Sequence, residues 1–202
     1  MDLFVYENDL RRMGYKYICG IDEAGRGPLA GPVFAAAVIL PENCEIEGLN
    51  DSKKLSEKKR EELFPIICEK AVAYSIAFAT EEEIDEVNIL NATYLAMKRA
   101  QEGLKIPCDY ALVDGNRMPP LNVEAETIVK GDAKSASIAA ASILAKVSRD
   151  RVMYEIDKIY PEYNFAKHKG YGTKLHVEAL LKYGPCKVHR RTFLKKILGE
   201  NI

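Results

Sequence analysis

The sequence predicts an α/β fold in which helices cover both faces of a mixed five-stranded sheet. Five short segments are rich in β-branched, aromatic and small apolar residues, and helical patterns lie between and after them. The first three segments are expected to form an antiparallel meander, whereas the long helical pattern before the fourth permits a parallel crossover. The expected strands are 15–22, 33–40, 71–79, 109–115 and 125–132.

Two helices are expected within the first half of the chain. Residues 55–71 carry charge on one face and apolar side chains on the other, and Ser56 is a suitable N-cap. Pro65 is expected to kink or shorten this helix. Residues 82–104 have helical periodicity, with a break expected near Asn88.

The last third of the chain is helical and basic. A long helix is expected from Ser135, and its first turns of Ala and Ser are small enough to pack closely on a sheet. Residues 1–129 carry 14 Lys and Arg against 23 Asp and Glu, whereas residues 130–202 carry 15 against 7. This asymmetry indicates a polyanion-binding surface beside an acidic site.

The composition is that of one globular domain. The chain has 202 residues, of which 48% are hydrophobic and 29% charged. The N-terminus lacks a signal-peptide pattern, and the longest apolar run, 33–40, is too short to span a bilayer, so we expect a cytoplasmic protein without a membrane partner. The five cysteines are scattered without a C-x-x-C pair, so buried free thiols are expected. The three histidines lack a metal-binding spacing, so an imidazole metal site is not expected.

A glycine-rich loop follows the first expected strand. Residues 25–30 match G-x-G-x-x-A, but a strand is expected after them, where the dinucleotide fingerprint requires a helix. A Walker loop fails as well, because Pro32 follows Gly31 where lysine is required. Asp22 and Glu23 precede the loop and would repel a phosphate unless a cation lay between them.

Four carboxylates fall at or just past expected strand ends, namely Asp22, Glu23, Asp114 and Asp132. Gathered acids raise one another's pKa unless cations neutralise them, and all-oxygen ligands suit Mg²⁺ or Mn²⁺. Two metals about 3.5–4 Å apart would bind the acids and a scissile phosphate and would activate a water. Adjacent strand residues point to opposite faces, so we expect a bulge or break near Ala24.

Five motifs together resemble the bacterial ribonuclease HII family, the type 2 ribonucleases H. They occur in the family's order and spacing, from about Tyr17 onward. They are IDEAGRGPLAGPV at 21–33, DSKKLS at 51–56, VDG at 113–115, KGDAKSASIAAASILAKVSRDR at 130–151 and HKGYGT at 168–173.

The resemblance implies a ribonuclease H-like sheet and a single domain over residues 1–202, with a sheet-containing core at about 14–160 and a basic helical segment at 161–202. It implies a monomeric endoribonuclease that depends on Mg²⁺ or Mn²⁺ and acts in ribonucleotide excision repair. The substrates would be RNA/DNA hybrids and duplex DNA with an embedded ribonucleotide. Cleavage 5′ to that ribonucleotide would leave 3′-hydroxyl and 5′-phosphate ends.

The resemblance also assigns roles to individual residues. The catalytic, metal-binding positions fall on the four carboxylates named above. The loop that holds the 2′-hydroxyl and its neighbouring phosphate falls on Gly25, Arg26 and Gly27, and the tyrosine that senses the RNA–DNA junction falls on Tyr171. A 2′-hydroxyl both donates and accepts hydrogen bonds, so close backbone groups can recognise it.

Further phosphate contacts are expected from basic residues outside this loop. Ser52 and Lys53 are expected to contact one phosphate. The residues expected to follow the nucleic-acid backbone are Lys146, Arg149, Lys167, Lys169, Lys187, Arg190 and Arg191.

Two other functions fit the same residues. One is a ribonuclease H that requires a run of several ribonucleotides. The other is a module that binds hybrids or phosphate, in which the acids hold a structural cation.

Overall fold

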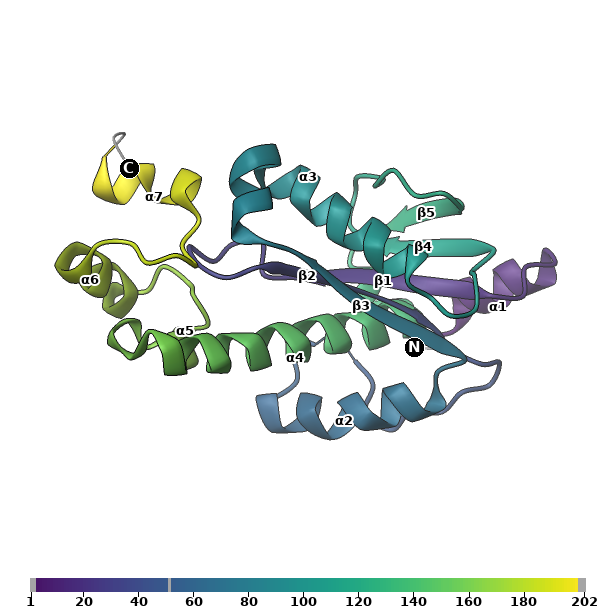
Figure 1. Cartoon of the computed structure of the whole chain (residues 1–202). Coiled ribbons are helices and arrows are strands. Elements are labelled where there is room, and N and C mark those ends of the chain that lie inside the picture. The colour runs from purple at the N-terminus through teal and green to yellow at the C-terminus, as the bar shows by residue number, and fades with distance from the viewer. Residues whose placement is uncertain (1–2, 51, 200–202) are drawn as a thin grey trace.

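The computed structural model describes residues 3–50 and 52–199 and contains one five-stranded sheet (Figure 1). Its strands are β1 (Ile18–Ala24), β2 (Val33–Ile39), β3 (Ala73–Ala79), β4 (Tyr110–Asp114) and β5 (Glu124–Ile128). The order is β3-β2-β1-β4-β5, which places β1 at the centre. The β1–β2 and β2–β3 pairs are antiparallel, and the β1–β4 and β4–β5 pairs are parallel. The predicted meander and crossover are therefore both confirmed.

Helices cover both faces of this sheet, as predicted. They are α1 (Val5–Arg12), α2 (Glu57–Lys70), α3 (Glu81–Glu102), α4 (Ala136–Ile159), α5 (Phe165–His168), α6 (Lys174–Tyr183) and α7 (Arg191–Leu198), with 3₁₀ turns η1 (Gly131–Ala133) and η2 (Pro161–Tyr163). Helix α3 lies on one face, and α4 and α2 lie on the other (Figure 1). Helices α5 to α7 gather at one end of the sheet, and α1 lies at the opposite end. The sequence pattern does not predict α1.

Local signals set the helix boundaries well. The Ser56 side chain caps α2 by accepting a hydrogen bond from a backbone N–H of the first turn. Asn88 has φ of 68° and interrupts α3 at the predicted place. Helix α2 continues through Pro65, so the expected shortening is wrong; Leu63 and Ile67 flank this position and are fully buried, which stabilises the helix on both sides.

The fifth strand is shorter than predicted. It ends at Ile128 instead of continuing to Asp132. Lys130 adopts a left-handed conformation with φ of 58°, which turns the chain away from the sheet. Asp132 consequently lies in the 3₁₀ turn that leads into α4. Nothing in the local sequence marks this turn, because a left-handed lysine is uncommon.

Gly20 of the central strand allows β1 to pack directly against α4. A Cβ atom at Gly20 would lie 2.1 Å from the backbone carbon of Ser137 and 2.2 Å from the backbone nitrogen of Ile138. Separate apolar cores fill the two sides of the sheet: Cys19 and Ile21 face the α3 side, whereas residues such as Ala36 and Val38 of β2 face the α4 side. The small residues at the start of α4 are therefore a packing requirement.

The C-terminal segment packs against the loop between β1 and β2, residues 25–32. Gly31 N–H donates to the Val188 carbonyl at 2.9 Å, and Leu29 N–H donates to the Gly170 carbonyl at 2.8 Å. A third apolar cluster, which includes Ala30, lies between the loop and helices α5 to α7. The basic end of the chain is thus built onto the glycine-rich loop.

All five cysteines are free thiols. Three are buried, as predicted, and Cys68 and Cys186 are only partly buried. None of the helices in residues 3–50 and 52–199 is long and apolar enough to cross a membrane.

The packing of β1 on α4 predicts the effect of a single methyl group. Gly20→Ala should lower the free energy of unfolding by about 1–3 kcal/mol, because the added Cβ overlaps backbone atoms that cannot rotate away. Gly27→Ala is the control, since its Cβ would meet only a Tyr171 ring atom at 3.6 Å. Denaturant unfolding of the two variants measures both values; equal stability would contradict the close approach.

Candidate active site

The adjacent acids at the end of β1 lie on opposite faces of the sheet. The strand pairs regularly with β2 as far as Ala24, and Gly25, with φ of 99°, ends it. The predicted break is therefore present, but the strand carries no bulge, and the break does not turn either acid. Glu23 shares the α3 side with Ile21, and Asp22 points to the α4 side.

Asp114 and Asp132 reach the same end of the sheet from neighbouring segments. Asp114 is the last residue of β4, which pairs with β1. Its Oδ1 accepts a hydrogen bond of 2.6 Å from Gly131 N–H, which ties β4 to the turn that carries Asp132. Asp132 is buried, and its Oδ2 lies 3.8 Å from Lys53 Nζ. All four predicted carboxylates are thus brought to one region.

The electrostatics show that these acids act on one another. Burial raises the pKa of Asp22 well above its usual value, and the negative charges of Glu23, Asp114 and Asp132 raise it further. Burial also raises the pKa of Glu23, although the nearby Arg26 guanidinium opposes this shift. Such mutual repulsion in a partly buried group is typical of a site that receives a cation.

The donor set suits a hard divalent cation bound by few protein ligands. Within the described residues, no three acidic, histidine or cysteine side chains are placed to hold one metal ion together. Mg²⁺ characteristically uses one or two carboxylates and completes its shell with water and substrate phosphate. The oxygen-only set at the end of β1 and β4 fits that mode of binding.

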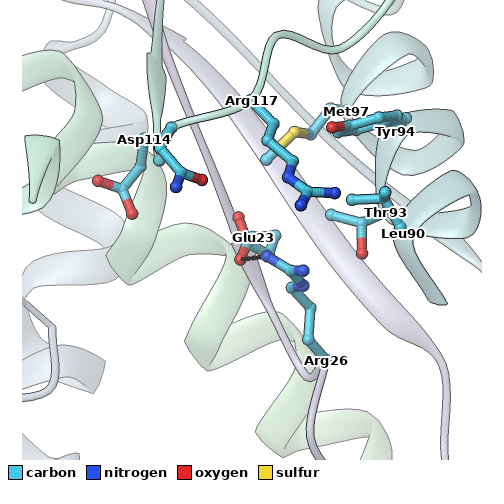
Figure 2. A pocket seen from close by; sticks show the side chains of 10 residues that line it. Glu23, Arg26, Leu90, Thr93, Tyr94, Met97, Asp114 and Arg117 are labelled. Carbon is cyan, nitrogen blue, oxygen red and sulfur yellow. Dashed lines mark hydrogen bonds and ion pairs between the residues drawn. The ribbon is translucent and has the colours of Figure 1, made fainter. Parts of the chain in front are cut away.

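Two cavities flank the end of β1. One, of about 380 Å³, lies on the α3 side and is lined by Glu23, Asp114 and residues of α3 (Figure 2). The guanidinium groups of Arg26 and Arg117 both point into the space beside Glu23 (Figure 2). Arg117 lies just past β4, and the sequence pattern does not identify it as a site residue.

The second cavity, of about 210 Å³, lies on the α4 side. It brings together all six predicted substrate-binding residues with both acids of the pair. Its lining includes Asp22, Glu23, Gly25, Arg26, Gly27, Ser52, Lys53, Lys146 and Tyr171. Asp51, the first residue of the DSKKLS motif, lies outside the described residues.

The two glycines of the GRG motif meet different surroundings. Gly25 has positive φ, and a Cβ there would lie 2.1 Å from Arg149 Nε, so only glycine fits. Gly27 faces open space except for the exposed Tyr171 ring, 3.6 Å from the position of its Cβ. The bare backbone of Gly27 and the ring of Tyr171 therefore form one continuous surface.

Two arginines that were expected to follow the nucleic-acid backbone are buried instead, and that expectation is wrong. Arg190 donates to the carbonyls of Gly25, Arg26, Pro28 and Gly31 at 2.6–3.1 Å. The physical reason is that the loop turns these carbonyls toward the interior, where the buried guanidinium of Arg190 satisfies them. Burial, with the charge of Arg149, lowers the pKa of Arg190 to about 9.

Arg149 completes this support from α4. It donates to the carbonyls of Ala30 and Pro32 at 3.1 Å and to Lys169 at 3.0 Å. Burial lowers its pKa as well. Arg149 belongs to the motif that ends in SRDR, but its structural role follows only from its hydrogen bonds to residues 30 and 32, which are distant in the sequence.

The fold and this arrangement of acids define the class of protein. Among solved structures, the ribonuclease H2 of Pyrococcus horikoshii OT3 is similar with a TM-score of 0.71 and 31% identity, over 88% of this chain and 93% of that one. The chain thus has the fold of the ribonucleases H.

Sequence comparison narrows the class to one family. The ribonuclease HII family model matches residues 19–196. Ribonucleases HII from two bacteria are similar over most of both chains: that of Caldicellulosiruptor bescii is 60% identical over 97% of this chain and 95% of the relative, and that of C. saccharolyticus 57% over 96% and 95%. The chain belongs to the ribonuclease HII family. It is a type 2 ribonuclease H, an enzyme that acts on RNA/DNA hybrids.

Charge repulsion at Asp22 predicts a stabilising substitution. Asp22→Asn should increase the free energy of unfolding by on the order of 1 kcal/mol, about 2–4 °C in Tm, because it removes a buried charge and keeps the oxygen that accepts from Glu23 N–H. The pKa of Asp22 is raised in the folded state, so the wild-type protein loses stability as the pH rises from acid to neutral. The extra stability of Asp22→Asn over the wild-type protein should therefore grow as the pH rises. Thermal unfolding in EDTA at several pH values measures this.

The control for this prediction is another buried acid with a cationic partner. Asp150 lies 2.6 Å from Lys146 Nζ, so Asp150→Asn should lower the Tm. A lower Tm for Asp22→Asn at neutral pH would show that the acid is stabilised by its neighbours and would contradict the repulsion.

Proposed function

We propose that the enzyme cleaves the RNA strand of hybrids and also nicks duplex DNA on the 5′ side of a single embedded ribonucleotide, leaving 3′-hydroxyl and 5′-phosphate ends. The observation that carries this proposal is the shared surface of Gly27 and Tyr171 beside the carboxylates. A surface of that kind can test one sugar for a 2′-hydroxyl and the next sugar for its absence.

The loop would recognise the ribonucleotide. Gly25 and Gly27 leave backbone groups accessible to a sugar edge, and Arg26 is half exposed beside Glu23, where it can meet a phosphate. The Tyr171 ring would pack on the sugar of the following nucleotide, where an added hydroxyl would crowd it. Ser52 and Lys53 line the same cavity and would contact a phosphate.

The principal ligands of two divalent cations, Mg²⁺ or Mn²⁺, would be Asp22, Glu23 and Asp114. Asp132 would complete the coordination of the second cation or orient the attacking water. When bound, the cations would supply charge that stabilises the leaving oxygen and lowers the pKa of water. The raised pKa values of Asp22 and Glu23 support this assignment, because bound cations relieve the same repulsion. Lys53, 3.8 Å from Asp132, would hold that carboxylate near its place.

We also propose a monomeric enzyme with a single domain over residues 1–202, in which one copy of the chain carries the carboxylates, the GRG loop and Tyr171. The hydrogen bonds between the C-terminal segment and residues 25–32 support treating residues 14–160 and 161–202 as parts of that one unit. The proposed substrates include duplex DNA with an embedded ribonucleotide, which supports a role in ribonucleotide excision repair in the bacterial cytoplasm.

One assay tests the activity. We expect incision 5′ to the ribonucleotide in a duplex with a single ribonucleotide, and incision of a long RNA/DNA hybrid, with Mg²⁺ or Mn²⁺ and not in EDTA. Asp22→Asn and Asp114→Asn should lower turnover by at least about 10³-fold while the protein still binds both duplexes. Cut sites are mapped on sequencing gels. Cleavage of the hybrid alone would favour the enzyme that needs a ribonucleotide run, and binding without cleavage would favour the binding module.

A second test addresses Tyr171. Tyr171→Ala should lower kcat/KM on the single-ribonucleotide duplex about tenfold more than on the hybrid, because only the first substrate presents a deoxyribose after the ribonucleotide. Tyr183→Ala is a matched control, since Tyr183 is 50% exposed and Tyr171 45%. An equal loss on both substrates, or a parallel loss of Tm, would remove the proposed role.

A further inference from the structure

A buried chain of hydrogen bonds links the C-terminal segment to the backbone of Tyr171. The Cys186 N–H lies 3.0 Å from His189 Nδ1, and His189 Nε2 lies 3.0 Å from His176 Nε2. His176 Nδ1 in turn lies 2.9 Å from the Tyr171 carbonyl oxygen. Both imidazoles are fully or almost fully buried. None of these groups has a part in the proposed chemistry.

The direction of every bond in this chain follows from its two ends. The Cys186 N–H can only donate, so His189 Nδ1 accepts, and neutral His189 carries its proton on Nε2. That proton is donated to His176 Nε2, which leaves the proton of His176 on Nδ1, where it faces the Tyr171 carbonyl. Each ring nitrogen has a partner with both rings neutral, and His189 Nδ1 also lies 3.1 Å from Cys186 Sγ, whose S–H can donate to it. Burial lowers the pKa of each ring to about 4, which agrees with neutral imidazoles at physiological pH.

The neighbouring bonds hold the same turn. The Tyr171 N–H donates to the His168 carbonyl at 2.9 Å, and Gly170 N–H donates to His168 Nδ1 at 3.2 Å. Lys169 and Gly170 both have positive φ, and a Cβ on Gly170 would lie 2.5 Å from the Ala30 carbonyl oxygen. The turn therefore packs against the loop that carries the GRG motif, and the Tyr171 side chain stays exposed.

We propose that His176 and His189 are positioning residues, which fix the Tyr171 backbone so that its ring stands beside Gly27 and distinguishes a deoxyribose from a ribose. This inference rests on the proposed role of Tyr171. The C-terminal segment then contributes to substrate selection through the interior of the protein, and not only through its exposed lysines.

The experiment removes the donor to Tyr171 and then restores it. His176→Phe cannot donate to the Tyr171 carbonyl, whereas the amide N–H₂ of His176→Asn can occupy the position of Nδ1–H. His176→Phe should reduce kcat/KM on the single-ribonucleotide duplex about tenfold more than on the RNA/DNA hybrid, and His176→Asn should recover most of this difference. In a Tyr171→Ala background, His176→Phe should change the ratio of the two activities by less than twofold.

Controls separate positioning from a loss of fold. Leu194→Ala creates a cavity in the same apolar cluster, so it should lower Tm without changing the activity ratio. If His176→Phe does not fold, His189→Leu tests the same chain, because it removes the donor to His176 and the acceptor of the Cys186 N–H while the His176 ring stays in place. An unchanged activity ratio in the variant that folds, or a full effect in the Tyr171→Ala background, overturns the inference.

A measurement without substrate distinguishes this inference from the proposed function. Amide hydrogen exchange of residues 169–173 should become at least about tenfold faster in His176→Phe than in Leu194→Ala. If exchange is faster in His176→Phe but Tyr171→Ala does not change the ratio of the two activities, the proposed role of Tyr171 is wrong and the hydrogen-bond chain still positions the turn. Unchanged exchange would remove the positioning chain, whatever the enzyme cleaves.

Discussion

The geometry of the site depends on two buried arginines that collect the carbonyl groups of one loop. Residues 25–32 leave the central strand at a left-handed glycine and return as β2, so their carbonyls turn toward the interior. Arg190 and Arg149 together donate to six of these carbonyls and to that of Lys169. A guanidinium presents five N–H groups in a rigid plane, which a lysine cannot reproduce. Its burial costs solvation energy, and unsatisfied carbonyls would cost more.

This constraint ties the C-terminal segment to the loop that borders the candidate site. Arg190 follows His189 directly, and Ala30 forms a β-bridge with His189. The same short stretch therefore supports the GRG loop through Arg190 and the Tyr171 turn through His189. Because the loop and the turn are fixed by neighbouring residues of one stretch, their relative positions are rigidly coupled. A substrate sugar that spans Gly27 and Tyr171 would meet a preformed surface.

The antiparallel meander, the Ser56 cap, the break at Asn88 and the candidate acids could be predicted because they depend on local patterns or on motifs of known spacing. Ser56 and Asn88 act on their own helices, and periodicity marks the strands. Arg149 and Arg190 were misassigned because their partners lie more than a hundred residues away, and a basic residue in a polar sequence is usually exposed. The 3₁₀ turn of Asp132 was missed because a left-handed lysine carries no compositional signal. The roles of the acids rest on the family resemblance, and the geometry adds where each one points.

Because β1 pairs regularly up to Ala24, Asp22 and Glu23 lie on opposite faces of the sheet. A bulge would have brought Asp22 and Glu23 to one face, where two carboxylates would repel each other strongly. On opposite faces they are separated, yet Glu23 borders both cavities, beside Arg117 in one and beside Ser52 and Lys53 in the other, whereas Asp22 borders only the second. A nucleic-acid strand that passes the end of the sheet would then have cationic groups on both sides of its scissile phosphate. The adjacent acids would then lie where the nucleic acid passes the edge of the sheet, with the glycine-rich loop bordering the cavity that Asp22 lines.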